Sequence, residues 1–242
     1  MENNKQFHHF KTYKKYVTML NPYIYPTKPM DYDGNEYTPI VIGTQTWLLE
    51  NLKTTHFRNG VVIPNITNDT QWTSYGETSS QAAYCDYNNS DVNGSKYGHL
   101  YNWFAATDSQ NIAPTGYHVP TQAEFDTLNA YVSANFGTSL SVGKALAATA
   151  DWQSDTGLNT VGNNQAINNF SGFSGMPAGA RYYAIGTPVS FTLLNQFAAF
   201  WTIDTLGGGD KKNVGLYYLF SNFITVSNNR QSCGFSIRCI KD

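Results

Sequence analysis

Residues 120–137 read PTQAEFDTLNAYVSANFG and carry the clearest helix signal in the chain. Thr121 and Glu124 form a T-x-x-E capping box directly after Pro120, so each side chain can satisfy the backbone amide of the other residue. Gly137 is a typical helix stop. We therefore predict a helix between Thr121 and Gly137. Its buried face follows the helical period and comprises Phe125, Leu128, Tyr131, Val132 and Phe136.

Two other segments have a helical pattern. In YGHLYNWFAAT, residues 97–107, Leu100, Trp103 and Phe104 recur at i, i+3 and i+4 and form one apolar stripe. A third helix is predicted near 142–149.

Strand signals flank these helices. DYDGNEY at 31–37 contains the turn former Asp33-Gly34-Asn35, and TPIVIG and QTWLLENL follow it as two predicted strands. In the C-terminal CGFSIRCI the alternation places Phe235, Ile237 and Cys239 on one face, and Ser236 and Arg238 on the other. Asp31, Asp33 and Asn35 do not form an EF-hand loop, because the required Gly and Glu positions hold Glu36 and Ile42.

The segments between these elements are long. Residues 58–96 are rich in Asn, Ser, Thr and Gly and predict a long surface excursion, and about 50 residues dense in Gly and Asn follow the third helix. Together the patterns predict an α+β fold with two main helices, a small antiparallel sheet and long loops. Loops of this length in a compact domain are usually functional.

Composition excludes several classes of protein. The 242 residues are 13% charged with a net charge of -2, so no basic field is available to collect nucleic acid. We predict no nucleic-acid partner and no membrane span, since no apolar run reaches about 18 residues. The chain instead holds 25 Asn, 17 Tyr and 14 Phe, which favours turns, strands and binding surfaces.

Residues 1–30 differ from the rest. They contain five Lys and one Glu, and three prolines near their end favour an extended arm, so we interpret 1–30 as an arm or docking segment and 31–242 as the folded domain. A partly disordered leader is the alternative.

We expect no signal peptide, because the start has no apolar core or small-residue cleavage site. Three cysteines fit a reducing folding compartment.

Six sequence blocks follow one another in order: DYDGNEY…PIVIGTQTWLLENLKTT, AAYCDYNN…YGHLYNWFAA, APTGYHVPTQAEFDTL, SGFSGMPAGAR, AFWT and GFSIRCIKD. In this order they resemble the Fibrobacter succinogenes major paralogous domain over about 31–242. The resemblance implies a C-type-lectin-like fold. It also implies one of two settings: a surface module of gut and rumen Bacteroidetes-type bacteria, or a variable protein of a diversity-generating retroelement, often phage-borne, whose C-terminal stretch is retargeted by adenine mutagenesis.

Two positions depart from the family pattern. Ala113-Pro114 stands where the family usually has Cys-Pro, and Cys233 stands where it often has Asn. Adenine mutagenesis of an Asn codon can produce Cys, as well as the Tyr, Phe, Ser, Ile and Thr found nearby.

We therefore expect a contact surface between Thr202 and Cys233. A mixture of aromatic and small polar residues resembles an antibody paratope, because aromatic rings give contact area at low entropic cost and Asn adapts its hydrogen bonds. Ordinary core strands are the alternative. The predicted ligand-binding residues are Asp204, Thr205, Tyr218, Phe220, Asn222, Phe223, Ile224, Asn228, Asn229 and Cys233.

Other chemistries have weaker support. The five histidines lack the i, i+4 spacing of a helical zinc site, and neither Glu-Pro-Asn nor Gln-Pro-Asp occurs, so we expect no cofactor and no required calcium. Formylglycine-generating enzymes share the lectin-like fold class and use a C-terminal cysteine pair. Cys233 and Cys239 lie six residues apart, about 20 Å on a regular strand, which argues against a disulfide and favours a buried Cys239.

Several large side chains have predicted structural roles. Arg181 and Arg238 fall in the family blocks, and we interpret them as buried polar links between loops and sheet. The tryptophans that we assign to the core are Trp47, Trp103, Trp152 and Trp201.

The favoured function is a non-enzymatic ligand- or receptor-binding protein, on a phage tail or encoded beside a retroelement. Its partner would be a cell-surface protein or glycan, with residues 1–30 joining a homo-oligomer or tail assembly. The alternative is a bacterial cell-surface adhesin or polysaccharide-binding module. The expected location is the virion or the bacterial cell surface.

Overall fold

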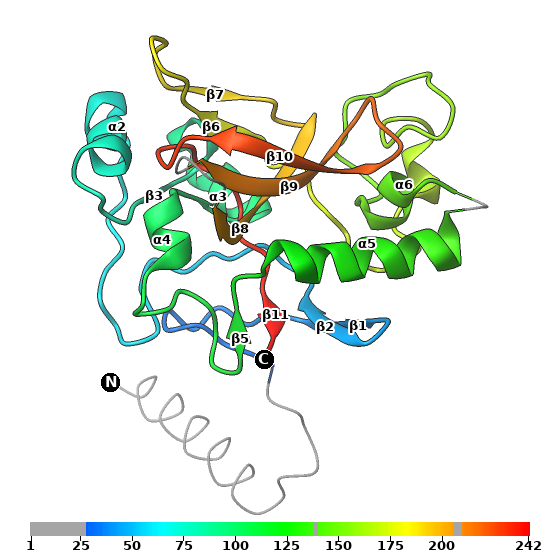
Figure 1. Ribbon diagram of the computed structural model, residues 1–242, viewed down its shortest axis with the longest axis horizontal. Coiled ribbons are helices and arrows are strands. Elements are labelled where there is room, and N and C mark those ends of the chain that lie inside the picture. Colours follow the sequence, from blue (N-terminus) through cyan, green and yellow to red (C-terminus); the bar gives the residue numbers. More distant parts are fainter. Residues whose placement is uncertain (1–27, 138–139, 206–209) are drawn as a thin grey trace, which may run out of the picture.

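The computed structural model describes residues 28–137, 140–205 and 210–242 (Figure 1). Within these ranges it contains five α-helices and several small antiparallel sheets, which confirms the α+β class. Most of the predicted N-terminal arm, residues 1–27, lies outside the described residues. The three that follow pack with the domain, since Met30 forms an antiparallel bridge with Glu36.

The helices differ greatly in length. They are α2 (Asp69–Glu77), α3 (Asp91–Tyr97), α4 (Trp103–Thr107), α5 (Gln122–Phe136) and α6 (Val142–Leu146). The prediction of two main helices is therefore wrong. α5 is the longest helix of the described ranges, and four shorter ones accompany it.

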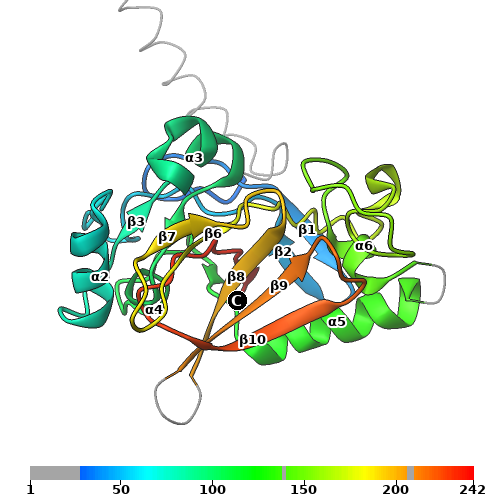
Figure 2. The ribbon, with the colours of Figure 1, turned by 90° about the horizontal axis from the view of Figure 1, so that it is seen from above.

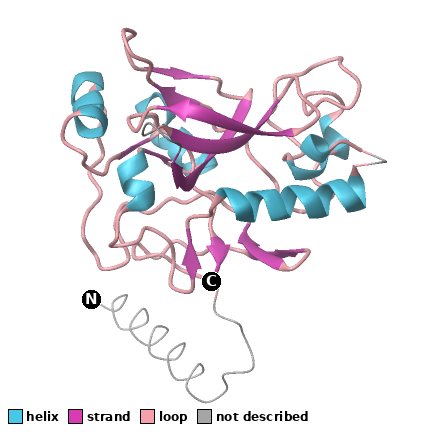
Figure 3. Cartoon of the chain, viewed as in Figure 1, coloured by secondary structure: helices cyan, strands magenta, loops and turns pink. Residues whose placement is uncertain are grey.

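In the view of Figures 1 and 3, the two larger sheets lie above and below α5. The sheet beside the C-terminus has the order β1 (Pro39–Ile42), β2 (Gln45–Leu48), β11 (Ile240–Lys241), β5 (Tyr117–His118). The other has the order β10 (Phe223–Asn229), β9 (Lys211–Tyr217), β8 (Phe197–Thr205). Two short ladders complete the fold: β3 (Tyr84–Cys85) with β4 (Leu100–Tyr101), and β6 (Ala180–Tyr182) with β7 (Ser190–Thr192).

The capping box at the start of α5 is confirmed. The Glu124 amide donates to Thr121 Oγ1, and the Thr121 amide donates to Glu124 Oε2 at 2.8 Å. Phe125, Leu128 and Val132 are buried as predicted. Tyr131 is 39% exposed instead, and one face of its ring packs over Gly43, where an added Cβ would lie 2.7 Å from the ring.

The predicted helix at 97–107 is shorter in the structure. Leu100 and Tyr101 form β4, and α4 begins only at Trp103. Asn102 sets this boundary, because its side chain caps the helix by accepting a hydrogen bond from the Ala105 amide. The third predicted helix is confirmed as α6.

The predicted loop over 58–96 is partly wrong, because it contains both α2 and α3. Asn68 caps α2 by accepting a hydrogen bond from the Gln71 amide at 3.0 Å. Trp72 is fully buried, and its indole N–H donates to the Ser232 carbonyl at 2.6 Å. Trp72, with the partly buried Tyr75 beside it, therefore anchors a helix whose other residues are mostly polar.

The β8–β10 sheet lies between two parts of the core. On one face, Phe200, Val214 and Leu216 pack with residues of α5. On the other, Phe197 and Trp201 belong to a cluster with Trp103 of α4. Figure 2 shows α5 running alongside β10 on one side of this sheet. The predicted core tryptophans are buried, and Trp72 joins them.

The C-terminal segment 233–240 is buried at every position. The Ser236 carbonyl accepts from the Trp201 amide, and the Ser236 amide donates to the Ala199 carbonyl, both at 3.1 Å. The Cys239 carbonyl accepts from the Leu48 amide at 2.9 Å. The segment thus joins β8 to β2 through its backbone.

The sequence predicts two alternating faces for this segment, and in the structure the side chains of both faces are buried. Arg238 is fully buried, and its guanidinium donates to Asn51 Oδ1 at 3.0 Å and to the Phe173 carbonyl at 2.7 Å. Arg181 is also fully buried and donates to the Ile66 carbonyl at 2.6 Å. Both arginines are polar links between loops and strands, as the sequence predicts.

His118 of β5 connects the capping box to the C-terminus. Its Nε2 lies 2.8 Å from Glu124 Oε1, and its Nδ1 lies 2.8 Å from Asp242 Oδ1. Burial disfavours the charged ring, but the hydrogen bonds to Asp242 and Glu124 outweigh it and raise the pKa of His118. Burial also opposes ionisation of Glu124, yet hydrogen bonds from Thr121 and His118 lower its pKa.

This geometry predicts a pH-dependent stability. A raised pKa in the folded state gives a contribution that is full below about pH 6.5 and disappears as pH rises through the folded pKa of His118. The lowered pKa of Glu124 gives a contribution that is full above about pH 4.5 and disappears as pH falls. Urea unfolding of wild type and His118→Gln should therefore differ most between these two pH values. A difference that does not change with pH would contradict the assignment.

Candidate functional site

The β9–β10 turn presents two neighbouring exposed apolar side chains of the β8–β10 sheet. Leu219 is 41% exposed and Phe220 45% exposed, and Ser221 and Asn222 beside them are also exposed. Tyr217 lies under this turn, with its ring centroid 5.1 Å from that of Phe220. We call residues 217–222 the turn patch.

The backbone of the turn patch is held in place by α6 and by the segment that follows it. The Gly143 amide donates to the Ser221 carbonyl at 2.8 Å, and the Val161 amide donates to the Phe220 carbonyl at 3.0 Å. The Gly162 amide donates to the carbonyl of Tyr218 at 2.8 Å. The exposed side chains therefore project from an ordered backbone, which lowers the entropic cost of binding.

Strand β10 continues the exposed surface beyond the turn. Thr225 and Ser227 are exposed, while Ile224 and Val226 are half-buried against the core cluster that contains Trp201. Within the described residues, β10 pairs only with β9 and forms an edge of its sheet. A partner could contact both its outward side chains and its unpaired backbone groups.

The predicted contact residues fall into two groups at opposite ends of the sheet. Tyr218, Phe220, Asn222 and Phe223 lie together in and beside the β9–β10 turn. Thr205 lies at the other end, opposite Lys211 in the ladder. Seven-residue strands separate these ends by about 20 Å.

Asp204 and Thr205 belong to the second group, together with Asn228 and Asn229, since Asn229 also pairs with Lys211. Asp204 Oδ2 accepts from the Gln122 amide at 2.6 Å, at the start of α5, where a negative charge is favoured. Thr205 is exposed at the end of β8. Asp204 is half-buried, and its position stabilises the helix.

The structure buries two of the predicted contact residues, so the prediction that they face solvent is wrong. Asn229 is only 2% exposed, because the β-bulge between Val226 and Asn229 turns its side chain inward, where its amide donates to Asn213 Oδ1 at 2.7 Å. Cys233 is fully buried, and its thiol donates to the Tyr183 carbonyl. Burial raises the pKa of the Cys233 thiol to about 11, so it is a neutral core residue. Asn228, at the bulge, is exposed.

Tyr218, Phe223 and Ile224 are only partly accessible. Tyr218 and Phe223 pack against the core cluster that contains α5, and Ile224 packs against the other. Sequence reasoning missed Tyr217, Leu219 and Thr225. The signal for Leu219 is in GLYYLFSNF, where the apolar residues continue past the end of β9. Because the sheet can cover only part of such a run, some of its apolar side chains must be exposed.

The described residues contain neither a candidate metal site nor a candidate membrane-spanning helix. In the described ranges, no group of three or more His, Cys, Asp and Glu side chains could hold a metal ion. None of the helices placed by the structure has both the length and the apolar character needed to cross a bilayer.

The comparisons with known proteins give one family. The family model described as Fibrobacter succinogenes major domain matches residues 40–241. No curated protein and no solved structure matches the chain.

The burial pattern predicts that two asparagines in the same stretch respond differently to replacement. Asn229→Ala should lower the free energy of unfolding by about 1–3 kcal/mol, because it leaves the buried Asn213 without its partner. Asn222→Ala, the matched control, should change it by less than about 0.5 kcal/mol. Urea denaturation of both variants tests this, and equal losses would mean that the exposed stretch is part of the core.

Proposed function

The chain belongs to the Fibrobacter succinogenes major domain family, and we propose that it is a non-enzymatic ligand- or receptor-binding protein with a C-type-lectin-like fold. The ligand is a cell-surface protein or glycan, and no cofactor is required. The turn patch and the outward side of β10 make the contacts.

The exposed turn patch is the observation that carries this proposal. Leu219 and Phe220 project into solvent although their backbone is fixed, an arrangement that stabilises no part of the core. Exposed apolar groups clustered on an ordered backbone are typical of interaction sites. Burial of Phe220 against a partner would give the aromatic anchor that binding hot spots often contain.

The neighbouring residues fit an adaptable contact surface. Ser221, Asn222, Thr225 and Ser227 supply exposed hydrogen-bonding groups around the apolar anchor. Small polar residues beside aromatic rings are the composition of antibody paratopes. Their replacement would leave the buried layer beneath them unchanged.

This separation supports a variable surface. We propose that the exposed positions of 203–228 are diversified by a retroelement and that the protein is displayed on a phage tail or a bacterial cell surface. The buried segment that follows would stay constant, since any change there meets packed neighbours. Residues 1–30 would dock the domain to a larger assembly.

Binding measurements test the contact surface directly. A glycan array and a panel of whole bacterial cells would be screened with wild type, and any binding partner would be titrated with the variant Leu219→Ser/Phe220→Ser/Asn222→Ala. We expect affinity to fall by at least about tenfold, because the apolar anchor is lost.

The control carries Val41→Ser and Val92→Ser, which replace exposed side chains on β1 and α3. It should bind as wild type does. Equal binding by the turn-patch variant would show that recognition occurs elsewhere on the protein.

A further inference from the structure

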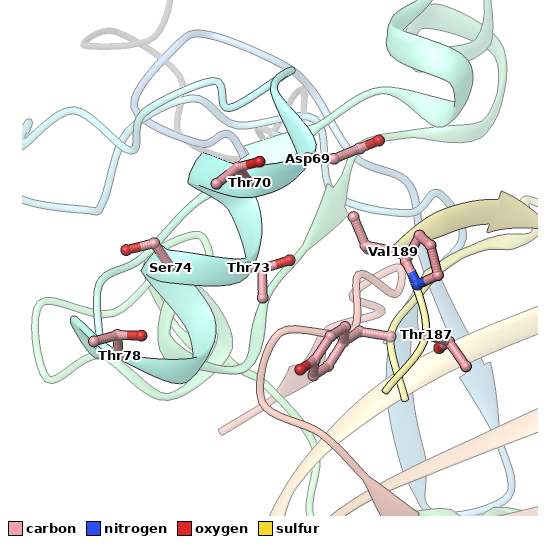
Figure 4. Close-up of a pocket in the computed structure, with 9 residues that line it drawn as sticks. Asp69, Thr70, Thr73, Ser74, Thr78, Thr187 and Val189 are labelled. Atoms are coloured by element: carbon pink, nitrogen blue, oxygen red, sulfur yellow. The ribbon is translucent and has the colours of Figure 1, made fainter. Parts of the chain in front are cut away.

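A second site lies away from the turn patch, in a groove of about 460 Å³ between α2 and the connection from β6 to β7. This volume lies within the range of small-molecule sites. Figure 4 shows Thr70 and Thr73 on α2 facing the segment that carries Thr187 and Val189. The groove is lined by Asp69, Thr70, Thr73, Ser74, Thr78, Tyr183, Thr187, Pro188 and Val189.

The helix that forms one wall of the groove is held at both ends. Arg181 of β6 pairs with Asp69 at 2.5 Å, and its guanidinium carbon lies 4.5 Å from the ring centre of Trp72. At the other end of α2, Glu77 Oε1 accepts from Ser232 Oγ at 2.7 Å. Arg181 therefore ties the start of α2 to β6, and Glu77 ties its end to the C-terminal segment.

Hydroxyl groups are concentrated on the wall that α2 provides. Thr70, Thr73 and Ser74 recur at i, i+3 and i+4, so they share one face, and the fully buried Trp72 lies on another. Thr and Ser are weaker helix formers than Ala, Glu or Lys. Three poor helix formers thus share one face of α2, although packing requires none of them there.

These hydroxyls are not used by the helix itself. In other helices the threonine hydroxyl donates to the carbonyl four residues earlier: Thr107 to Trp103 at 3.0 Å and Thr127 to Ala123 at 2.9 Å. The side-chain hydroxyls of Thr70 and Thr73 have no hydrogen-bond partner among the described residues. Both can donate to, and accept from, a molecule in the groove.

The charge of the lining restricts the class of ligand. No Lys, Arg or His is among the nine residues that line the groove, and the Asp69 carboxylate, whose side chain is 63% exposed, disfavours an anion. One Asp69 oxygen engages Arg181, which leaves the other as an acceptor for a hydroxyl. Tyr183 adds an aromatic ring to the lining.

We propose that this groove binds a neutral carbohydrate, a mono- or disaccharide unit. Sugar hydroxyls match the threonine hydroxyls and the free carboxylate oxygen, and the C–H face of a sugar ring suits the apolar Pro188, Val189 and Tyr183 surface. The site is separate from the turn patch and binds its ligand whether or not the proposed function of that patch is correct.

Saturation-transfer NMR and calorimetry on the full chain test the proposal, with D-glucose, D-galactose, N-acetyl-D-glucosamine, cellobiose and lactose as probes. At least one probe should bind wild type. Thr70→Val/Thr73→Val removes two hydroxyls at nearly constant shape and should weaken binding by about tenfold or more.

The matched control, Thr107→Val/Thr127→Val, makes the same change on α4 and α5 and should bind as wild type does. Circular dichroism would verify that both variants are folded. The proposal is overturned if none of the five sugars binds, or if binding is unchanged in the Thr70/Thr73 variant.

Discussion

The buried C-terminal segment 233–240 is the constraint on which the rest of the structure depends. Its backbone bonds to β8 and β2, and its bridges reach β4 and β6, so it joins elements that are far apart in sequence. Burying a peptide segment is favourable only when its polar groups are paired, and this segment pairs them with several neighbours. Both parts of the core meet at it, through Phe235 on one side and Ile240 on the other.

The buried guanidinium of Arg238 determines which loop packs against this segment. Arg238 is fully enclosed, and side-chain and backbone oxygens surround its guanidinium, with Phe173 stacked at 4.6 Å. A charge so placed is costly without its partners, which fixes the loop containing Phe173 against the segment. The exposed part of the turn patch, residues 219–222, lies outside the core that this junction holds together, whereas Tyr217 and Tyr218 beneath it pack against the core.

Sequence predicts the parts of the fold whose signals are local. The Thr121–Glu124 box and the apolar period after it locate α5, and the turn former Asp33-Gly34-Asn35 indicates the two strands that follow it. α2 was missed because only Trp72 and Tyr75 give it an apolar side, while most of its other residues are the Thr, Ser and Gln that are common in loops. Packing against Ser232, which is remote in sequence, stabilises that helix.

The candidate site shows the same limit. An Asn beside a turn predicts exposure, and this holds for Asn222 and Asn228. Asn229 is buried because a β-bulge reverses its direction, and a bulge depends on the partner strand. Cys233 is buried because it enters the central segment, which no local pattern reveals.

The central claim is that a replaceable surface lies on a constant, buried segment. Saturation mutagenesis of residues 203–205 and 210–239 in a displayed library, selected for resistance to proteolysis, measures this directly. Our account predicts wide tolerance at exposed positions such as 219–222 and 225, and intolerance from 232 to 239. Equal intolerance along the whole stretch would show that these residues are ordinary core strands and would contradict the account.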